Sequence, residues 1–280
     1  MSGKRSFWQR AAAAPHMVWS VLFIIAPLIF VLYYSFTDSQ GNFTLDNIKS
    51  IFNQKYVVIF VNSVTLAVIA TLICLVIAYP LAYIFSRMRE RWQKIAILLT
   101  MLPLWMNFLI TTYSWMTLLE DTGVINSILK KIGLNPIHMI NTPGAVVVGM
   151  VFCFLPYMIL PIYSVMAGLD VQLIEAAADL GCNSFKILTK VIMPMSVSGV
   201  VSGITMVFVP SISTFFISQK LGGGTFQLIG DTIEGYFTGT AINYNVGASL
   251  SLILMILILI SMAIMNRYTD TEDTKGRPML

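Results

Sequence analysis

The chain has 280 residues, of which 57% are hydrophobic and 11% charged, with a formal net charge of +4. Its mean hydropathy is +0.80. This composition favours an integral membrane protein over a soluble domain. Three scattered cysteines and two histidines supply neither a disulfide framework nor a metal site. The small positive charge gives no sign of a nucleic-acid partner, and we expect none.

The first apolar run extends from about Met17 to Tyr34. It is too long for the core of a signal peptide and no small-residue cleavage site follows, so it predicts a retained membrane span. Further runs of about 20 residues, enough to cross the hydrocarbon, lie near residues 57–85, 95–118, 144–166, 195–217 and 246–265. We therefore predict an all-α protein with six transmembrane helices. The expected organisation is a cytosolic segment (1–16), one membrane domain (17–266) and a cytosolic tail (267–280).

Lys and Arg residues indicate the orientation. Twelve of the 17 fall in the two terminal segments and in the loops after the second and fourth predicted spans. By the positive-inside rule, both termini and these loops face the cytosol. A residue of the loop after the third span, such as Asn126, is then expected to be reachable from outside. On the fifth span, Gly199 and Gly203 form a small-residue face suited to close helix contact.

The loop between the fourth and fifth predicted spans is the most polar long segment of the chain. Asp170 can cap a first helix and Gly181 suits its left-handed end. Asn183 or Ser184 can cap a second helix, and Pro194 falls in the first turn of the next apolar run. We expect the first helix to have one apolar face, formed by Leu173, Ala176, Ala177 and Leu180.

This loop resembles the signature of ABC-importer permeases: Glu-Ala-Ala, three residues, Gly, nine residues, then an aliphatic pair and Pro. Val191 and Met193 stand where Ile and Leu are usual. The resemblance implies a type I ABC-importer permease fold, with a coupling loop at 167–194 whose first helix docks into a cytosolic ATPase. The coupling residues it implies are Glu175, Ala176, Ala177, Asp179, Gly181 and Pro194. The alternative is an interfacial amphipathic helix without a partner.

Other segments resemble the first of the two permeases in spermidine/putrescine importers. They are residues 62–66, 79–82, 103–107, 155–164 and 221–230. The resemblance implies a polyamine substrate, a second permease subunit as heterodimer partner, two copies of an ABC ATPase and an extracellular solute-binding protein. It also implies that this chain holds no cofactor, because the partner ATPase binds ATP and Mg. Permeases for iron, sulfate or aminophosphonate share the layout, so another small solute remains an alternative.

The sequence argues against an enzyme. No phosphate-binding Gly-x-x-x-x-Gly-Lys motif occurs, because the Gly222–Gly224 run is followed by Thr225 rather than Lys. No catalytic constellation is found, so a membrane enzyme has no support. The six predicted spans hold no Asp, Glu, Lys or Arg in their interiors, whereas proton-coupled carriers need buried titratable groups. A stand-alone channel or secondary carrier is thus a weaker alternative.

A substrate path for a polycation needs ring faces and carboxylates. The candidates are Trp105, Asn107, Tyr113, Tyr157, Asp231 and Glu234. The two acids are three residues apart and share a face of any helix, which suggests an outer collecting site. The alternative for the aromatic residues is that they anchor the protein at the membrane interface, and for the acids that they are merely solvated.

Overall fold

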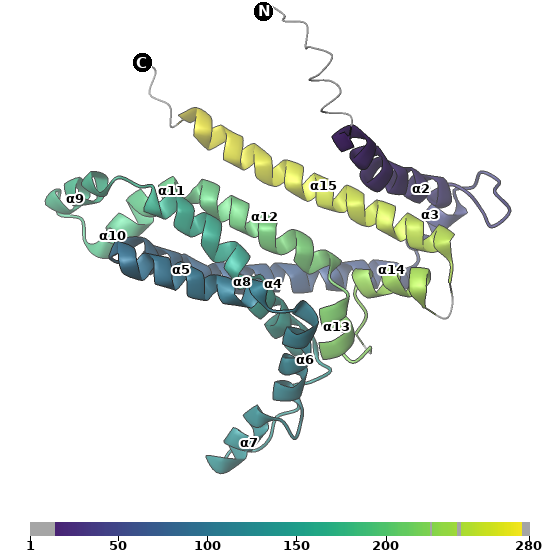
Figure 1. Ribbon diagram of the computed structural model, residues 1–280, viewed down its shortest axis with the longest axis horizontal. Helices are drawn as coiled ribbons and strands as arrows, with labels where there is room; N and C mark the ends of the chain where they lie inside the picture. Colours follow the sequence, from purple (N-terminus) through teal and green to yellow (C-terminus); the bar gives the residue numbers. More distant parts are fainter. Residues whose placement is uncertain (1–14, 225, 240–241, 276–280) are drawn as a thin grey trace, which may run out of the picture. The chain divides into compact units, whose positions relative to one another are not determined.

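The computed structural model describes residues 15–224, 226–239 and 242–275 (Figure 1). The predicted N-terminal segment lies outside the described residues except for residues 15 and 16, as do the last five residues of the predicted tail. The described residues are mostly helical, and the only β-structure among them is an isolated antiparallel bridge between Thr37 and Phe43.

The helices follow the chain in this order. The first half holds η1 (Val21–Ile25, a π-helical turn), α2 (Ala26–Ser35), α3 (Asp46–Ile51), α4 (Gln54–Arg87), α5 (Glu90–Trp105), α6 (Phe108–Leu119) and α7 (Val124–Lys131). The second half holds α8 (Pro143–Ala167), α9 (Val171–Asp179), α10 (Ser184–Ile187), η2 (Leu188–Ile192), α11 (Met193–Met195), α12 (Val197–Ser213), α13 (Phe216–Leu221), α14 (Ile229–Thr238) and α15 (Tyr244–Lys275).

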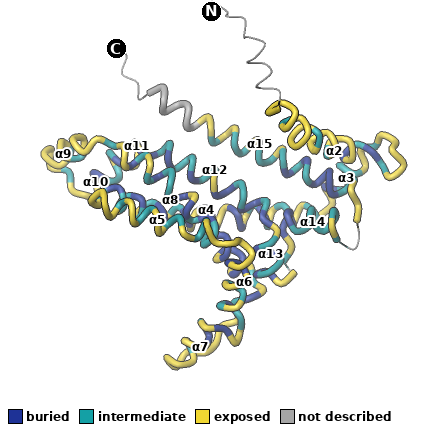
Figure 2. The backbone as a smooth tube through the Cα atoms, in the orientation of Figure 1, coloured by how far each residue is buried: buried dark blue, intermediate teal, exposed yellow. Residues whose placement is uncertain are grey.

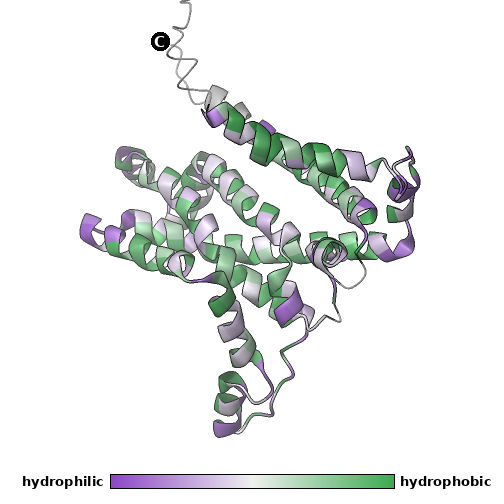
Figure 3. Ribbon diagram, turned by 45° about the vertical axis from the view of Figure 1, so that its right-hand side comes forward, coloured by the Kyte–Doolittle hydropathy of each residue, from purple (hydrophilic) through white to green (hydrophobic). Residues whose placement is uncertain are grey.

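Among the described residues, four helices are long and apolar enough to cross a membrane unbroken: Pro15–Ser35, Gln54–Arg87, Pro143–Ala167 and Tyr244–Arg267. They correspond to the first, second, fourth and sixth predicted spans. Figure 3 shows that hydrophobic residues cover the middles of the long helices, while hydrophilic residues gather at their ends and in the loops. This is the pattern of helices whose middles face hydrocarbon.

The third and fifth predicted spans are not single straight helices, and this corrects the sequence prediction. The third is Glu90–Trp105 followed by Phe108–Lys131, bent by 90°, and the fifth is Ser184–Met195 followed by Val197–Ser213, bent by 68°. The cause of the first bend is Asn107, whose side chain accepts hydrogen bonds from the N–H groups of the new helix, α6. Counting each bent pair as one crossing gives up to six spans.

Two compact units make up the chain. Unit 1 combines Met1–Val57 with Thr232–Ile256, and unit 2 combines Val58–Asp231 with Leu257–Leu280. In unit 1, the Asn245 side chain donates to the carbonyls of Tyr34 and Thr37, and the hydroxyls of Tyr56 and Tyr236 lie 2.5 Å apart. The single membrane domain at residues 17–266 stays a prediction.

The core of unit 2 centres on α8. Its residues Met150, Met158 and Ile162 are fully buried, and Figure 2 shows burial along α4, α8 and α12 but exposure at α7 and α9. A Cβ added to Gly199 would lie 2.9 Å from the Pro161 carbonyl oxygen, and one added to Gly203 would lie 2.7 Å from the Met158 sulfur. Both glycines therefore allow α12 to approach α8 closely, as the small-residue face predicts.

Candidate functional site: a coupling loop and a substrate path

Side-chain caps define the two helices of the loop at 167–194. The Asp170 carboxylate accepts a hydrogen bond from the Gln172 N–H at 2.9 Å, and α9 begins at the next residue. The Asn183 side chain accepts one from the Lys186 N–H at 2.9 Å, and α10 begins at Ser184. Of the two caps that the sequence left open, the structure selects Asn183. Each cap satisfies an N–H group that the helix itself leaves free.

Gly181 ends α9 in the left-handed conformation that the sequence predicts, with φ of +79°. Its N–H donates to the Ala178 carbonyl at 2.9 Å, and the Cys182 N–H donates to the Ala177 carbonyl at 3.1 Å. This pair of bonds is the Schellman arrangement. A Cβ at Gly181 would meet no atom within 4 Å. The need for glycine is therefore conformational and not steric.

The inner side of α9 is formed by Ile174 and Ala177, which pack against the hydrophobic core and, three residues apart, share one side of the helix. Of the predicted apolar face, Ala177 is partly buried, whereas Leu173, Ala176 and Leu180 are exposed. Most of the predicted apolar face is therefore accessible, and its docking into a partner stays a prediction.

The outward side of the loop forms what we name the coupling surface: Leu173, Glu175, Ala176, Asp179, Leu180 and Phe185, all exposed. Leu180 is 85% and Phe185 is 71% exposed. Neither the Glu175 nor the Asp179 carboxylate accepts a hydrogen bond from another residue in the described part of the chain. Large apolar side chains beside unbonded carboxylates are typical of a surface that a partner covers.

Buried residues anchor the end of the loop. Ile187 and Ile192 are buried, and Pro194 lies exposed near the end of the continuous helix Ser184–Met195, directly after the π-helical turn η2. The chain bends at Ser196 immediately afterwards. The loop is thus held firmly on its inner side, while its outer side stays accessible.

The aromatic residues of the candidate path are in different surroundings. Tyr157 lines a cavity of about 140 Å³ together with Pro103 and Thr111. Trp105 is 70% exposed and does not line this cavity. The Tyr113 ring already has a cation nearby, because the Lys220 Nζ lies 5.4 Å from its centroid. The Tyr157 ring is thus placed at an open space inside unit 2.

The polar residues of the candidate path have structural partners. The Asn107 side chain caps α6 and accepts from the Leu109 N–H at 2.9 Å. The two Asp231 oxygens accept from the Ser218 hydroxyl and the Leu228 N–H, both at 2.9 Å. Glu234 accepts from the Thr238 hydroxyl at 2.5 Å. Asn107 and Asp231 thus have structural functions that sequence reasoning missed, because each depends on where the chain turns.

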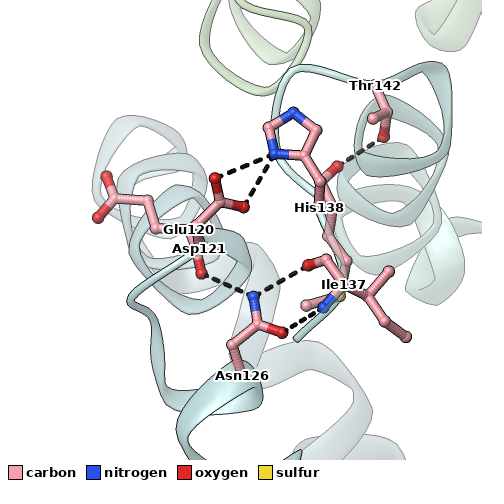
Figure 4. A network of polar contacts seen from close by, with 7 residues as sticks. Glu120, Asp121, Asn126, Ile137, His138 and Thr142 are labelled. Carbon is pink, nitrogen blue, oxygen red and sulfur yellow. Dashed lines mark hydrogen bonds and ion pairs between the residues drawn. The ribbon is translucent and has the colours of Figure 1, made fainter. Parts of the chain in front are cut away.

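The loop between α6 and α8 holds a polar network that sequence reasoning also missed (Figure 4). The Asn126 amide donates to the carbonyls of Glu120 and Ile137 at 3.3 and 3.0 Å and accepts from the Ile137 N–H at 2.8 Å. Asn126 is only 1% exposed, so the expectation that it is reachable from outside is wrong. The His138 Nδ1 lies 2.9 Å from an Asp121 oxygen.

Comparison with known proteins gives a family match over nearly the whole chain. The family described as "Binding-protein-dependent transport system inner membrane component" matches residues 13–271. The "Spermidine/putrescine transport system permease protein PotB" of Haemophilus influenzae is 35% identical, covering 88% of each chain. The protein of that name from Escherichia coli K12 is 32% identical, covering 84% of this chain and 88% of its own.

Solved structures share the fold. A bacterial ABC transporter "involved in the import of the acidic polysaccharide alginate" superposes with a TM-score of 0.79, covering 95% of this chain and 97% of the other at 16% identity. The MetNI methionine ABC transporter gives a TM-score of 0.59, covering 77% and 94% at 15% identity. The chain therefore has the type I ABC-importer permease fold. This confirms the fold class predicted from the sequence.

Proposed function

Since this chain belongs to the family of binding-protein-dependent transport system inner membrane components, we propose that it is the permease subunit of an ATP-driven importer for polyamines, spermidine and putrescine. The observation that carries the proposal is its 32–35% identity to spermidine/putrescine permeases over most of both chains. The subunit forms half of the translocation path. Its partners are a second permease, two copies of an ABC ATPase and an extracellular solute-binding protein.

The coupling surface is the proposed ATPase contact. It carries Glu175, Ala176 and Asp179 together with exposed apolar side chains, and Gly181 fixes the turn that follows. Docking of α9 into a cleft of the ATPase covers these side chains and transmits the movement of the ATPase to the spans. ATP and Mg are bound by the ATPase partner, and this chain holds no cofactor.

The proposed orientation places both termini and the coupling loop in the cytosol. Single cysteines at Arg89 and Ser184, both exposed positions, test it. In intact cells an impermeant thiol reagent should not label them. A cysteine at Lys131, which is exposed on the other side by this assignment, should be labelled and replaces the buried Asn126. Labelling of Ser184→Cys from outside contradicts the orientation.

Uptake by the complete complex tests the substrate. The assay uses proteoliposomes that contain the ATPase, both permeases and the binding protein. Labelled spermidine should accumulate only when ATP is supplied on the side of the membrane where the ATPase lies. Unlabelled putrescine should compete, whereas iron, sulfate and aminophosphonate should not. Competition by one of those solutes without competition by putrescine contradicts the polyamine assignment but leaves the importer assignment intact.

For the path, the same assay compares two variants of Tyr157, the candidate ring that lines a cavity. Tyr157→Phe keeps the ring face and should retain most of the maximal uptake rate, whereas Tyr157→Leu should lose it. Equal rates for the two variants would remove Tyr157 from the path.

A further inference from the structure

Unit 1 contains a pocket of about 660 Å³ that the candidate site does not include. Its walls come from the end of α2, the turn after it, α3 and the first residues of α15. The lining combines three tyrosines, Tyr33, Tyr34 and Tyr244, with one carboxylate, Asp38. The remaining described lining residues are neutral, and none is Lys, Arg or His.

The carboxylate of this pocket is charged at neutral pH. Asp38 Oδ1 accepts hydrogen bonds from the backbone N–H groups of Asn42 at 2.9 Å and Gln40 at 2.8 Å. These bonds, that from Asn42 above all, hold the pKa of Asp38 below its ordinary value. From the described residues, Oδ2 receives only the Asn42 side-chain amide, at 3.5 Å. One carboxylate oxygen is therefore available to a cation.

The tyrosines present ring faces beside this charge. The rings of Tyr33 and Tyr34 lie edge to face at 5.5 Å, and those of Tyr34 and Tyr244 lie 6.1 Å apart. All three side chains are exposed. An ammonium group near a tyrosine face is attracted by the ring quadrupole, and the ring also packs against methylene groups.

Two partly buried amides hold the floor of the pocket in place. The Asn245 Nδ2 donates to the Thr37 carbonyl and, at 3.2 Å, to that of Tyr34. The Asn47 Nδ2 donates to the same Thr37 carbonyl at 2.8 Å. These bonds join the end of α2, α3 and the start of α15, so the pocket exists before any ligand arrives. A preformed site avoids the ordering cost of binding.

We propose that this pocket binds a linear polyamine, with one ammonium at Asp38 and the adjoining methylenes and second ammonium against the rings of Tyr34 and Tyr244. The assignment rests on the proposed function. It places a substrate site on the outer side, because the pocket lies where the first span ends and the last begins. It also replaces the pair Asp231 and Glu234 as the outer collecting site, since both Asp231 oxygens accept hydrogen bonds at 2.9 Å, whereas Asp38 Oδ2 has only the contact at 3.5 Å.

The first test removes the charge and keeps the fold of the turn. In Asp38→Asn, Oδ1 still accepts from Gln40 and Asn42, so the turn persists. The matched control is Asp46→Asn, which removes an exposed carboxylate whose described ion-pair partner is the exposed Lys49.

In reconstituted complex, Asp38→Asn should raise the half-saturating spermidine concentration about two- to fivefold, with an unchanged maximal rate. The rise should be larger at about 0.01 M than at about 0.15 M ionic strength. Asp46→Asn should match the wild type.

The second test asks whether the aromatic ring of Tyr244 or merely the size of its side chain is needed for binding. Tyr244→Leu should raise the half-saturating concentration about two- to tenfold, whereas Tyr244→Phe should stay within about twofold of the wild type. If Asp38→Asn equals the wild type at both ionic strengths, the inference is overturned. It is also overturned if Asp46→Asn gives the same shift, since the effect is then general surface charge, or if the Phe and Leu variants of Tyr244 do not differ.

Direct binding distinguishes failure of the pocket from failure of the proposed function. The probe is an aryl-azide derivative of spermidine, applied to the whole complex in nanodiscs, with labelled residues identified by mass spectrometry. Labelling around Tyr244 that free spermidine displaces supports the pocket even if uptake reveals a different transported solute. Normal spermidine uptake without displaceable labelling there overturns the pocket and leaves the proposed function standing.

Discussion

The coupling loop and the loop between α6 and α8 are built alike. Each contains a short helix, α9 or α7, followed by a glycine of positive φ, which is +79° at Gly181 and +82° at Gly133. Each also exposes large apolar side chains, such as Phe185 at 71% and Ile128 at 53%. Figure 1 places α9 and α7 at different ends of unit 2. Exposure of apolar groups therefore does not distinguish them.

Polar contacts do distinguish the two loops. In the loop between α6 and α8, which we call the outer loop after its proposed orientation, the Asn126 side chain forms three hydrogen bonds to backbone groups and His138 pairs with Asp121. In the coupling loop, the side chains of Asp170 and Asn183 only cap the helices, and Glu175 and Asp179 face outward. The Asn126 and Asp121 side chains thus have partners within their own loop, while in the described part of the chain the Glu175 and Asp179 carboxylates of the coupling loop accept no hydrogen bond. Variants in the outer loop should affect stability, and variants in the coupling loop should affect coupling.

The largest expected effect is that of Gly181→Val, with Gly133→Val as matched control. A Cβ at either position meets no atom within 4 Å, so both variants carry the same conformational strain of about 1–3 kcal/mol. At Gly181 this strain acts on the turn that docks into the ATPase, so it should lower the coupling between the permease and ATP hydrolysis about 5- to 150-fold. Gly181→Val should abolish ATP hydrolysis stimulated by the loaded binding protein, while Gly133→Val preserves it. Equal hydrolysis in the two variants contradicts a coupling function for the loop.

Next in size is Asn126→Leu, which acts on stability. It leaves the Ile137 N–H without its hydrogen-bond acceptor and removes the amide donor to the Ile137 and Glu120 carbonyls, of which that of Glu120 keeps the Gly123 N–H at 2.8 Å. The loss costs about 1–3 kcal/mol. The thermal unfolding midpoint in detergent should fall, while stimulated hydrolysis per folded molecule stays normal. Ser127→Ala, at an exposed neighbouring position, is the control and should leave the midpoint unchanged. A drop in coupling without a drop in stability would reverse the assignment of the two loops.

A third comparison uses the exposed apolar residues directly. Phe185→Ala should weaken ATPase binding by more than about 1 kcal/mol if the ring is a central contact, measured by pull-down of the ATPase with the complex in detergent. Ile128→Ala removes an equally accessible aliphatic side chain from α7 and should leave that affinity unchanged. Equal losses for both would show that the assay reports general hydrophobic surface rather than the coupling surface.

The sequence predicts the spans, both helix caps and the turn at Gly181, because each depends on a few adjacent residues. It misses the bend at Asn107, since an asparagine cap is recognised only where a helix is known to start again. It does not indicate which side of α9 packs inward, because Leu173 and Ile174 are adjacent apolar residues in a short helix. The contacts of Asn126 and Asp231 join segments that the sequence does not place together.

The smallest expected effect is that of Glu175→Gln. An exposed charge at the rim of an interface contributes about 0.2–1 kcal/mol, so the variant should keep most of the stimulated hydrolysis that Gly181→Val loses. Rim charges act mainly on association rate and salt dependence. The loss should therefore be measurable near 0.01 M ionic strength, where the screening length is about 30 Å, and small at about 0.15 M, where it is about 8 Å. Asp121→Asn, which removes an exposed carboxylate of the outer loop, should leave hydrolysis unchanged at both. A loss in Glu175→Gln that persists at the higher ionic strength would instead place Glu175 in the buried centre of the ATPase contact.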